Sequence, residues 1–357
     1  MKNQLGIAIV GCGYWGINYL RVFSELPHSR IVVVCDQRPE RLQEVERRFR
    51  NVHLTTKIED VFRLDGVDAA VVCTPAATHY NMTRRCLLAG KHVLVEKPIT
   101  TTLADADELI ALAEATEMIL MVGHTFLYNP AVTKVKEYLE RGEVGRLYYL
   151  YARRTNMGPI RHDVNALWDL APHDVSIFNY LLDSTPNWVS AVGAKVLRNS
   201  REDVGFISLG YQTEIVGHIH VSWADAYKVR EVVVVGSNKR IVFNDSHPSE
   251  RVRVFNKGVA VVKPEVPTYG EYQLQMCDGD IISPSVDVGE PLKNQSIHFL
   301  QCVTEGIRPL SDGWSGRNVV QVMEAIDLSI KQHGTPVEIV KENNNGHQTR
   351  YAQSALG

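Results

Sequence analysis

The sequence lacks the features of a membrane-spanning or secreted chain. No apolar run approaches the ~18 residues that a transmembrane helix needs. The first residues lead directly into a short strand-like segment, without the long apolar stretch and small-residue cleavage site of a secretory signal. We therefore expect a cytoplasmic protein with no membrane partner.

The chain also lacks a surplus of charge of either sign. Lysine and arginine number 38 and aspartate and glutamate number 41, which leaves a formal net charge of −3. Proteins that bind nucleic acid or anionic membranes electrostatically need a basic surplus. The near balance argues against both kinds of partner.

Cysteine and histidine are poorly spaced for a metal site. The six cysteines include no C-x-x-C pair, which argues against zinc and redox centres and favours buried free thiols in a reducing compartment. His218 and His220 share one face of a predicted strand, as two metal ligands would, but no third ligand stands nearby. An exposed sheet face is the favoured interpretation, and we expect no metal. Neither G-x-S-x-G nor H-E-x-x-H occurs, so hydrolase chemistry has no support.

What the sequence does contain is a regular alternation of strand and helix patterns in its first third. A length of 357 residues corresponds to roughly two domains at about 150 residues each. Short, almost entirely apolar runs predict strands at 5–10, 31–35, 69–73, 92–95 and 119–122. Amphipathic patterns predict helices at 16–26, 39–50, 79–89 and 103–115. Strands buried on both faces and separated by helices are typical of a doubly wound α/β domain with a parallel sheet, a Rossmann fold.

The pattern changes after about residue 123. Longer, often alternating runs predict strands at 147–153, 188–197, 204–211, 214–223, 229–235, 240–243, 252–255 and 259–262. Helices are predicted at 131–140, 294–305 and 315–332. Alternation with one polar face is typical of an antiparallel sheet covered on one side. We therefore expect a Rossmann domain at 1–123, an α+β domain with a large, open, mostly antiparallel sheet at 124–341, and a flexible tail at 342–357.

Residues 11–16, Gly-Cys-Gly-Tyr-Trp-Gly, match the dinucleotide fingerprint G-x-G-x-x-G. The motif follows the first predicted strand and opens a helix, which is the context that it requires. The first glycine permits the tight turn, the second lets the backbone approach a pyrophosphate, and the third lets helix and strand pack closely. The helix N-terminus then offers N–H groups to the phosphates. The alternative is a tight turn in a domain that binds no nucleotide. The predicted cofactor-binding residues of this turn are Gly11, Gly13, Tyr14, Trp15 and Gly16.

Asp36 and Arg38 bear on the choice of dinucleotide. Asp36 ends the second predicted strand, twenty residues after Gly16, where a carboxylate accepts hydrogen bonds from the adenosine ribose and repels a 2′-phosphate. Arg38 is a counter-signal, because a guanidinium can pair with a phosphate or stack on adenine. We predict that both contact the cofactor and that NAD is favoured over NADP.

Two further loops follow the third and fourth predicted strands, at the sheet edge where such folds bind ligands. Their sequences are Cys-Thr-Pro-Ala-Ala-Thr-His at 73–79 and Val-Glu-Lys-Pro at 95–98. The alternative for each is ordinary turn chemistry around proline. The predicted cofactor-facing residues of the two loops are Thr74, Pro75, His79, Glu96 and Lys97.

Three side chains have the properties needed to move a hydride from an alcohol carbon to nicotinamide. The hydroxyl proton must leave to a base, and the developing alkoxide needs a positive neighbour. His173 is the candidate base, and Lys97 is a candidate either for stabilising the alkoxide or for exchanging the proton. If a helix begins at residues 171–172, Asp169 either orients one of these partners or caps the helix. The alternative for His173 is a packed or surface histidine.

The order of these motifs resembles the Gfo/Idh/MocA oxidoreductase family over nearly the whole chain. In that family the lysine of E-K-P and the aspartate and histidine of D-x-x-x-H form the catalytic set, which the resemblance carries to Lys97, Asp169 and His173. It also implies a Rossmann domain followed by an open-sheet domain used for dimer or tetramer contact, and a frequently cis Lys97–Pro98 bond. Many members carry an acid three positions after the histidine. Here Ser176 takes that position and Asp174 follows His173 directly, which leaves the substrate subgroup open.

Residues 153–158 read Arg-Arg-Thr-Asn-Met-Gly and precede Arg161, Asn165 and the run Trp-Asp-Leu-Ala-Pro-His-Asp at 168–174. This stretch resembles the nucleotide-sugar 3-dehydrogenases, which oxidise the C3 hydroxyl of sugars such as UDP-N-acetylglucosamine or its uronic acid. A cluster of arginines suits a phosphate or carboxylate on the substrate. The alternative is a solvated arginine face with a tryptophan used for packing. The predicted substrate-binding residues are Tyr128, Arg153, Asn156, Arg161, Asn165, Trp168 and His173.

Three functions therefore remain open from the sequence. The first is an NAD-dependent dehydrogenase of a nucleotide-linked sugar, and the second is the same chemistry on a free polyol or sugar such as inositol or glucose. The third is an NAD-binding sensor without catalysis. The joint presence of Lys97, Asp169 and His173 favours an enzyme, because a sensor has no need of a proton-transfer set. We expect a homodimer or homotetramer formed through the second sheet.

Overall fold

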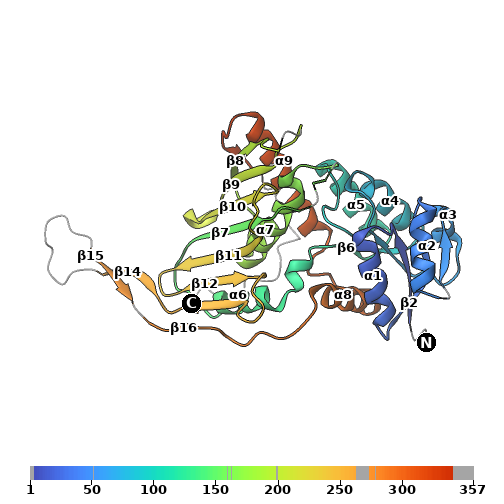
Figure 1. Ribbon diagram of the computed structural model, residues 1–357, viewed down its shortest axis with the longest axis horizontal. Coiled ribbons are helices and arrows are strands. Elements are labelled where there is room, and N and C mark those ends of the chain that lie inside the picture. Colours follow the sequence, from blue (N-terminus) through green and yellow to red (C-terminus); the bar gives the residue numbers. More distant parts are fainter. Residues whose placement is uncertain are drawn as a thin grey trace. The chain divides into compact units, whose positions relative to one another are not determined.

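The computed structural model describes residues 4–50, 52–158, 160–161, 163–197, 200–262, 273–277 and 279–340 (Figure 1). The chain forms two compact units. The first contains Met1–Asn129 and Gly289–Gln321, and the second contains Pro130–Val288 and Val322–Gly357. Residues Gly289–Gln321, expected within a second domain of 124–341, therefore join the first unit. The tail predicted at 342–357 lies outside the described residues.

A six-stranded parallel sheet forms the centre of the first unit. Its strand order is β3-β2-β1-β4-β5-β6. The strands are β1 (Leu5–Val10), β2 (Ser29–Cys35), β3 (His53–Thr55), β4 (Ala69–Val72), β5 (His92–Val95) and β6 (Leu120–Val122). From β1 the chain adds β2 and β3 on one side, and it then adds β4, β5 and β6 on the other side of β1. The order of strands therefore reverses between β1 and β4, and doubly wound sheets bind ligands at the carboxyl ends of the strands on either side of such a point. The predicted Rossmann fold is confirmed.

Helices cover both faces of this sheet. They are α1 (Tyr14–Glu25), α2 (Pro39–Arg48), α3 (Ile58–Arg63), α4 (His79–Leu88), α5 (Leu103–Ala115) and α8 (Pro291–Glu305). Helix α5 begins where Thr102 caps it, its hydroxyl accepting a hydrogen bond from Asp105 N at 3.2 Å. The sequence patterns did not predict β3 or α3, because three and six residues are too short to show a period.

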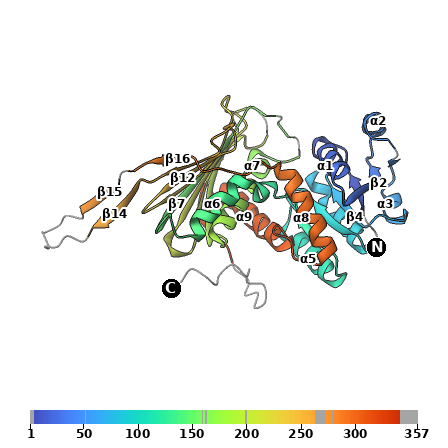
Figure 2. The same cartoon turned by 90° about the horizontal axis from the view of Figure 1, so that it is seen from below.

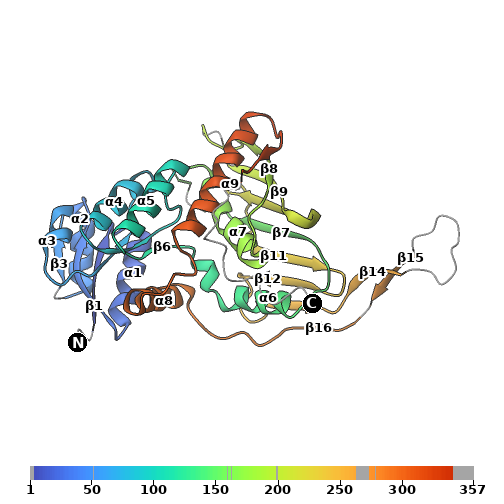
Figure 3. The same ribbon diagram turned by 180° about the vertical axis from the view of Figure 1, so that it is seen from behind.

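Helix α8 lies in the segment Gly289–Gln321, which returns to the first unit late in the chain. It lies beside α1 (Figure 3), where the rings of Phe23 and Phe299 meet at 6.5 Å. Gln295 Nε2 also donates to the hydroxyl of Tyr19 at 3.2 Å. The apolar period of a helix predicts that it has a buried face, but not the element against which that face packs.

A mixed sheet of nine described strands forms the second unit, in the order β16-β13-β12-β11-β7-β10-β9-β8-β17. Its strands are β7 (Leu147–Thr155), β8 (Trp188–Ala194), β9 (Val204–Gly210), β10 (Val216–Ser222), β11 (Val229–Gly236), β12 (Arg240–Asn244), β13 (Val252–Phe255), β16 (Ile281–Ile282) and β17 (Val337–Glu338). Only β7 and β10 pair in parallel among these neighbours. The predicted large, mostly antiparallel sheet is confirmed. Strands β14 (Gly258–Val262) and β15 (Gln273–Cys277) form a separate two-stranded ribbon.

Helices α6 (Pro130–Glu140) and α7 (Ala166–Leu182) pack against one face of this sheet (Figure 2). Helix α7 begins earlier than the residues 171–172 considered from the sequence. Asn165 caps it, its side-chain oxygen accepting a hydrogen bond from Trp168 N at 2.9 Å. Pro172 therefore lies inside the helix, where it removes one backbone hydrogen bond. Helix α9 (Gly313–Lys331) belongs to the second unit from Val322 onward.

The opposite face of the sheet carries exposed aromatic side chains, and no described helix packs on it. Phe206 stacks on His218 and His220, with ring centroids at 6.4 and 4.5 Å. The two histidines thus lie on the exposed face that their alternation predicts. Within the described ranges, no group of three or more His, Cys, Asp or Glu side chains is arranged to hold a metal ion. Among the same residues, no helix has both the length and the apolar composition needed to cross a membrane.

Candidate functional site

The glycine turn of the first unit has the shape that a dinucleotide requires. Gly11 has a φ of +93°, and a Cβ there would lie 2.8 Å from the carbonyl oxygen of Cys73. A Cβ on Gly16 would lie 1.9 Å from the Gly11 oxygen, whereas one on Gly13 would meet nothing within 4 Å. Gly13 is also the N-cap of α1 and has no side chain to cap it. The first N–H groups of α1 thus border open space, where a pyrophosphate fits.

Tyr14 and Trp15 begin α1 at the edge of this space. Their side chains are 79% and 41% exposed, and their rings meet edge to face at 5.4 Å. Large exposed aromatic side chains at the first turn are available to cover a bound nucleotide, as the sequence predicts. Their contact with the cofactor stays a prediction.

Asp36 is buried and tightly held at the end of β2. Its carboxylate accepts hydrogen bonds from Cys12 N at 2.7 Å and from Arg38 N at 2.9 Å. The Arg38 guanidinium adds contacts at 3.2 and 3.4 Å. Burial alone would raise the pKa of Asp36, but the hydrogen bonds from Arg38 and Cys12 lower it below its ordinary value. Asp36 is therefore a carboxylate at neutral pH, and Arg38, which is half exposed, is held beside it.

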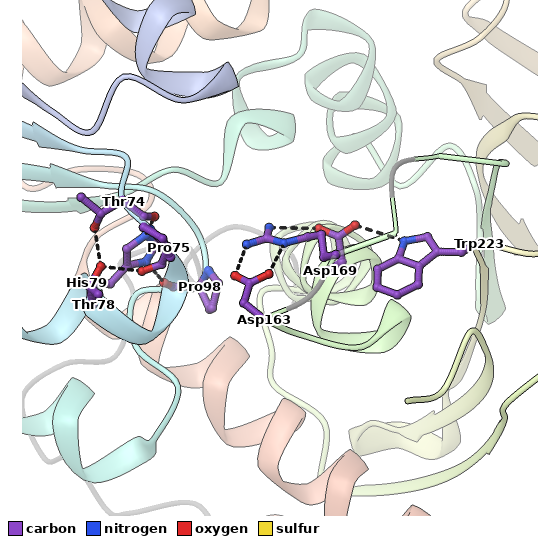
Figure 4. A network of polar contacts seen from close by, with 9 residues as sticks. Thr74, Pro75, Thr78, His79, Pro98, Asp163, Asp169 and Trp223 are labelled. Carbon is purple, nitrogen blue, oxygen red and sulfur yellow. Dashed lines mark hydrogen bonds and ion pairs between the residues drawn. The ribbon is translucent and has the colours of Figure 1, made fainter. Parts of the chain in front are cut away.

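His79 joins the two loops that follow β4 and β5. Its ring nitrogens lie 2.8 Å from the carbonyl oxygen of Thr74 and 2.7 Å from that of Pro98 (Figure 4). A neutral imidazole has one N–H, so both contacts are hydrogen bonds only when the ring carries two protons. The side chain is buried, and its ring thus holds the two loops together rather than facing outward. Pro75 precedes the short helical turn Ala76–Thr78 in the loop after β4.

Glu96 anchors the backbone of Lys97. One carboxylate oxygen accepts a hydrogen bond from the Tyr19 hydroxyl at 2.9 Å, and the other accepts one from Lys97 N at 3.1 Å. Both residues are buried. Burial, reinforced by Glu96, raises the pKa of Tyr19 well above its ordinary value, so the hydroxyl remains a donor. The Lys97–Pro98 peptide bond is cis, as the family resemblance implies.

Asp169 and His173 lie one turn apart on α7, so they share a face of the helix. One Asp169 oxygen accepts a hydrogen bond from Arg161 Nη1 and the other accepts one from Trp223 Nε1, each at 3.3 Å (Figure 4). Arg161 also donates to Asp163 at 2.9 Å and lowers the pKa of that carboxyl. Two donors thus fix the orientation of the Asp169 carboxylate. Local spacing did not reveal Trp223, although strand alternation puts it on the buried face of its sheet.

A buried ion pair ties the same helix to the sheet. Arg154 on β7 makes two hydrogen bonds to Asp174, at 2.9 and 2.7 Å, and the residues are only 5% and 1% exposed. Asp174, noted in the sequence as a departure from the family pattern, is therefore fixed by this ion pair directly beside His173. Arg153 points to the opposite, exposed face because successive side chains of a strand alternate. The structure thus separates Arg153 from Asp169 and His173, and its predicted substrate contact is not supported.

The remaining predicted substrate residues have structural partners. Trp168 is buried and donates to Asp327 at 2.8 Å, which matches the packing alternative. Besides capping α7, Asn165 donates to Glu202 at 3.0 Å. Tyr128, in the first unit, bonds to Ser311 Oγ at 2.9 Å through its hydroxyl and is buried. Asn156 differs, because its side-chain oxygen is buried without a hydrogen-bond partner among the described residues.

Comparisons with known proteins show which proteins this chain resembles. The chain is similar to UDP-N-acetylglucosamine 3-dehydrogenase of Acidithiobacillus ferrooxidans, with 23% identity over 329 residues that cover 90% of this chain and 96% of that protein. It is also similar to scyllo-inositol 2-dehydrogenase (NAD(+)) of Bacillus subtilis, with 28% identity over 205 residues, 56% of this chain and 60% of that protein. The solved structure of the WlbA dehydrogenase from Bordetella pertussis, in complex with NADH and UDP-GlcNAcA, matches with a TM-score of 0.79 and 18% identity, covering 96% of this chain and 99% of that one.

The family descriptions cover both units. Residues 5–124 match the oxidoreductase family with an NAD-binding Rossmann fold. Residues 132–242 match the GFO/IDH/MocA C-terminal domain. The chain therefore belongs to the Gfo/Idh/MocA oxidoreductase family, and its first unit is an NAD-binding Rossmann domain.

Proposed function

We propose that the protein transfers a hydride between nicotinamide and a hydroxyl-bearing carbon of a nucleotide-linked sugar, oxidising C3. The observation that carries the proposal is the Asp169 carboxylate, fixed by Arg161 and Trp223 one helical turn before His173. An anion held in one orientation beside a histidine is what a base needs to keep a single tautomer and stabilise its charged form. A sensor that only binds NAD has no use for it.

Each residue of the proposed set has one task. His173 accepts the proton of the substrate hydroxyl, and Asp169 holds and stabilises the imidazolium that forms. Lys97 carries a positive charge toward the oxygen that becomes electron-rich. NAD, when bound, supplies the hydride acceptor, and the glycine turn with Asp36 holds its pyrophosphate and ribose.

The share of this chain that each relative matches favours a nucleotide-linked substrate over a free polyol. The relative that acts on UDP-N-acetylglucosamine matches over 90% of this chain, whereas the inositol dehydrogenase matches over 56%. The side-chain oxygen of Asn156, which is buried and has no partner within the described ranges, adds an acceptor for a substrate N–H or O–H. Arg161 contributes less than expected to phosphate binding, because it is already paired with Asp163 and Asp169.

A substrate panel tests this proposal directly. Purified protein is mixed with NAD and either UDP-N-acetylglucosamine, its uronic acid, myo-inositol or glucose, and NADH is followed at 340 nm while thermal shift reports binding. We expect turnover and stabilisation with a UDP-sugar only. K97A and H173A should abolish turnover while NADH still binds. Turnover with myo-inositol alone would establish the polyol alternative, and NADH binding without turnover of any alcohol would favour the sensor.

We also propose that the exposed sheet face joins copies of the chain into a homodimer or homotetramer. Exposed Phe206, Tyr149 and Val216 lie on this face, and such apolar side chains favour association. Light scattering on purified protein gives the mass, and F206E should shift it toward the monomer. A wild-type protein that is monomeric at micromolar concentration contradicts this.

A further inference from the structure

His124 follows β6 at the same sheet edge where Lys97 follows β5. The two strands are parallel, with Val95 opposite Val122, so Lys97 and His124 each stand two residues beyond a paired position. The strand ends stay close beyond that pair, because Gly123 N donates to the Val95 oxygen at 2.7 Å. A Cβ on Gly123 would lie 3.1 Å from a carboxylate oxygen of Glu96. The backbone thus brings His124 beside the lysine assigned to charge stabilisation.

The imidazole of His124 is buried and makes no hydrogen bond to the part of the chain that the structure describes. The residue is 1% exposed, and neither ring nitrogen has a partner among the described residues. His298 and His79 differ in this respect. His298 Nε2 accepts a hydrogen bond from Leu310 N at 3.0 Å, and both nitrogens of His79 face carbonyl oxygens. A buried polar group without a partner is costly, so it needs an explanation such as a ligand that completes it.

The surroundings hold this imidazole in its neutral form. Burial, with the nearby charge of Lys97, lowers the pKa of His124 to about 3. At neutral pH the ring therefore has one N–H donor and one lone pair. It cannot serve as the proton acceptor of the reaction, but it is a donor and an acceptor fixed at a known place. An uncharged ligand group that both donates and accepts a hydrogen bond would satisfy both nitrogens of the His124 ring.

We propose that His124 is a ligand-binding residue of the dehydrogenase site, which pairs its donor and acceptor with an uncharged hydroxyl or carboxamide held beside Lys97. Two sources carry this chemistry, namely the carboxamide of nicotinamide and a hydroxyl of the substrate. An anionic phosphate fits less well, since the ring offers it one donor and one repelling lone pair. The inference rests on the proposed function and adds to it a residue that no motif of the sequence marks.

The imidazole resonances of the intact protein test this directly. Full-length chain labelled with 15N-histidine is recorded by long-range 1H–15N correlation from pH 5.5 to 8.5, and H124Q assigns the signals. We expect one protonated and one unprotonated nitrogen over the whole range. Adding NADH should shift both signals if the carboxamide is the partner. Shifts that need UDP-N-acetylglucosamine as well as NADH identify the substrate hydroxyl.

Binding constants of matched variants supply the second readout. H124F removes the donor and acceptor but fills the space, H124Q restores one polar end, and H53Q alters an exposed histidine as control. We expect H124F to weaken NADH, or the sugar in the presence of NADH, about tenfold or more while its Tm stays equal or rises. H124Q should recover part of the affinity, and H53Q should match the wild type.

Three outcomes overturn the inference while the proposed function stands. The first is NADH and sugar binding with unchanged His124 signals, and the second is a His124 ring that takes up a second proton within the tested pH range. The third is equal affinity of H124F and the wild type for NADH, and for the sugar in the presence of NADH. A wild-type protein that binds no NADH at all contradicts the proposed function instead. The resonance experiment uses wild-type protein, so it remains decisive even where H124F fails to fold.

Discussion

The choice between NAD and NADP depends on Asp36 and Arg38, and D36N separates their contributions. The Asp36 carboxylate accepts hydrogen bonds from Cys12 N and Arg38 N, at 2.7 and 2.9 Å. Asparagine keeps one acceptor oxygen for the bond to Cys12 but loses the charge. Its amide donors cannot face a guanidinium, so the Arg38 side chain, which is half exposed, is released.

The expected change in the Kd of each dinucleotide follows from the hydrogen bonds that D36N alters. A hydrogen bond to a charged group contributes ~1.5–3 kcal/mol, and ~1.4 kcal/mol corresponds to a factor of ten in Kd. Loss of the charged ribose acceptor should therefore weaken NADH about 10–100-fold. The released guanidinium can pair with a 2′-phosphate that is no longer repelled, so NADPH should tighten by about the same factor.

Fluorescence titration of NADH and NADPH at fixed ionic strength measures both effects. The set of variants is D36N, R38A and the double variant. If the released Arg38 binds the phosphate, the double variant loses the gain for NADPH but keeps the loss for NADH. A gain that persists without Arg38, or an equal loss for both dinucleotides in D36N, refutes the reasoning.

Three further outcomes follow from the buried polar groups. D174N leaves the buried Arg154 without its carboxylate, so the free energy of unfolding in urea should fall by about 3–5 kcal/mol, whereas replacing both by leucine should cost far less. Similar losses in the single and double variants would contradict this. W223F removes one donor from Asp169, and kcat should fall about 10–100-fold with little change in KM. An unchanged kcat would remove Trp223 from the mechanism. The pKa of Asp36 is lower in the folded protein than its ordinary value of 3.8, so the carboxylate stabilises the fold at pH values above 3.8. This contribution disappears as the pH falls through the lower folded value. D36N should thus lose more Tm at pH 7 than at pH 3, and a loss equal at both would show that the charge contributes nothing.

The first unit was predictable because its signals are local. Five of its strands are buried on both faces and read as apolar runs, and the fingerprint at 11–16 marks the turn between β1 and α1. The places of α8 and of residues 289–321 were not predictable. They depend on contacts such as that of Phe23 with Phe299, and the two residues lie far apart in the chain.

The site was predictable only as far as motifs reach. The motif D-x-x-x-H marked Asp169 and His173, but the sequence analysis considered a helix that begins only at 171–172, whereas the structure puts both residues inside α7, one turn apart. The residues that hold them come from other elements, and only alternation along a strand hints at them. Trp223 continues the buried positions Ile219 and Val221 of β10, and the same alternation separates Arg154 from Arg153. The two arginines, which are neighbours in the sequence, therefore lie on opposite faces of the sheet.

Both units position their proposed reactive groups by the same physical means. A buried or partly buried carboxylate accepts hydrogen bonds from a distant element, as Glu96 does from Tyr19 and Asp169 does from Trp223. Such groups add little stability, since apolar side chains of the same volume pack as well and cost no desolvation. What they add is orientation, because a hydrogen bond in a low-dielectric interior fixes a side chain that apolar contact would let rotate. Hydride and proton transfer tolerate little misplacement. Polar pairs that stability does not require are therefore best explained by the reaction.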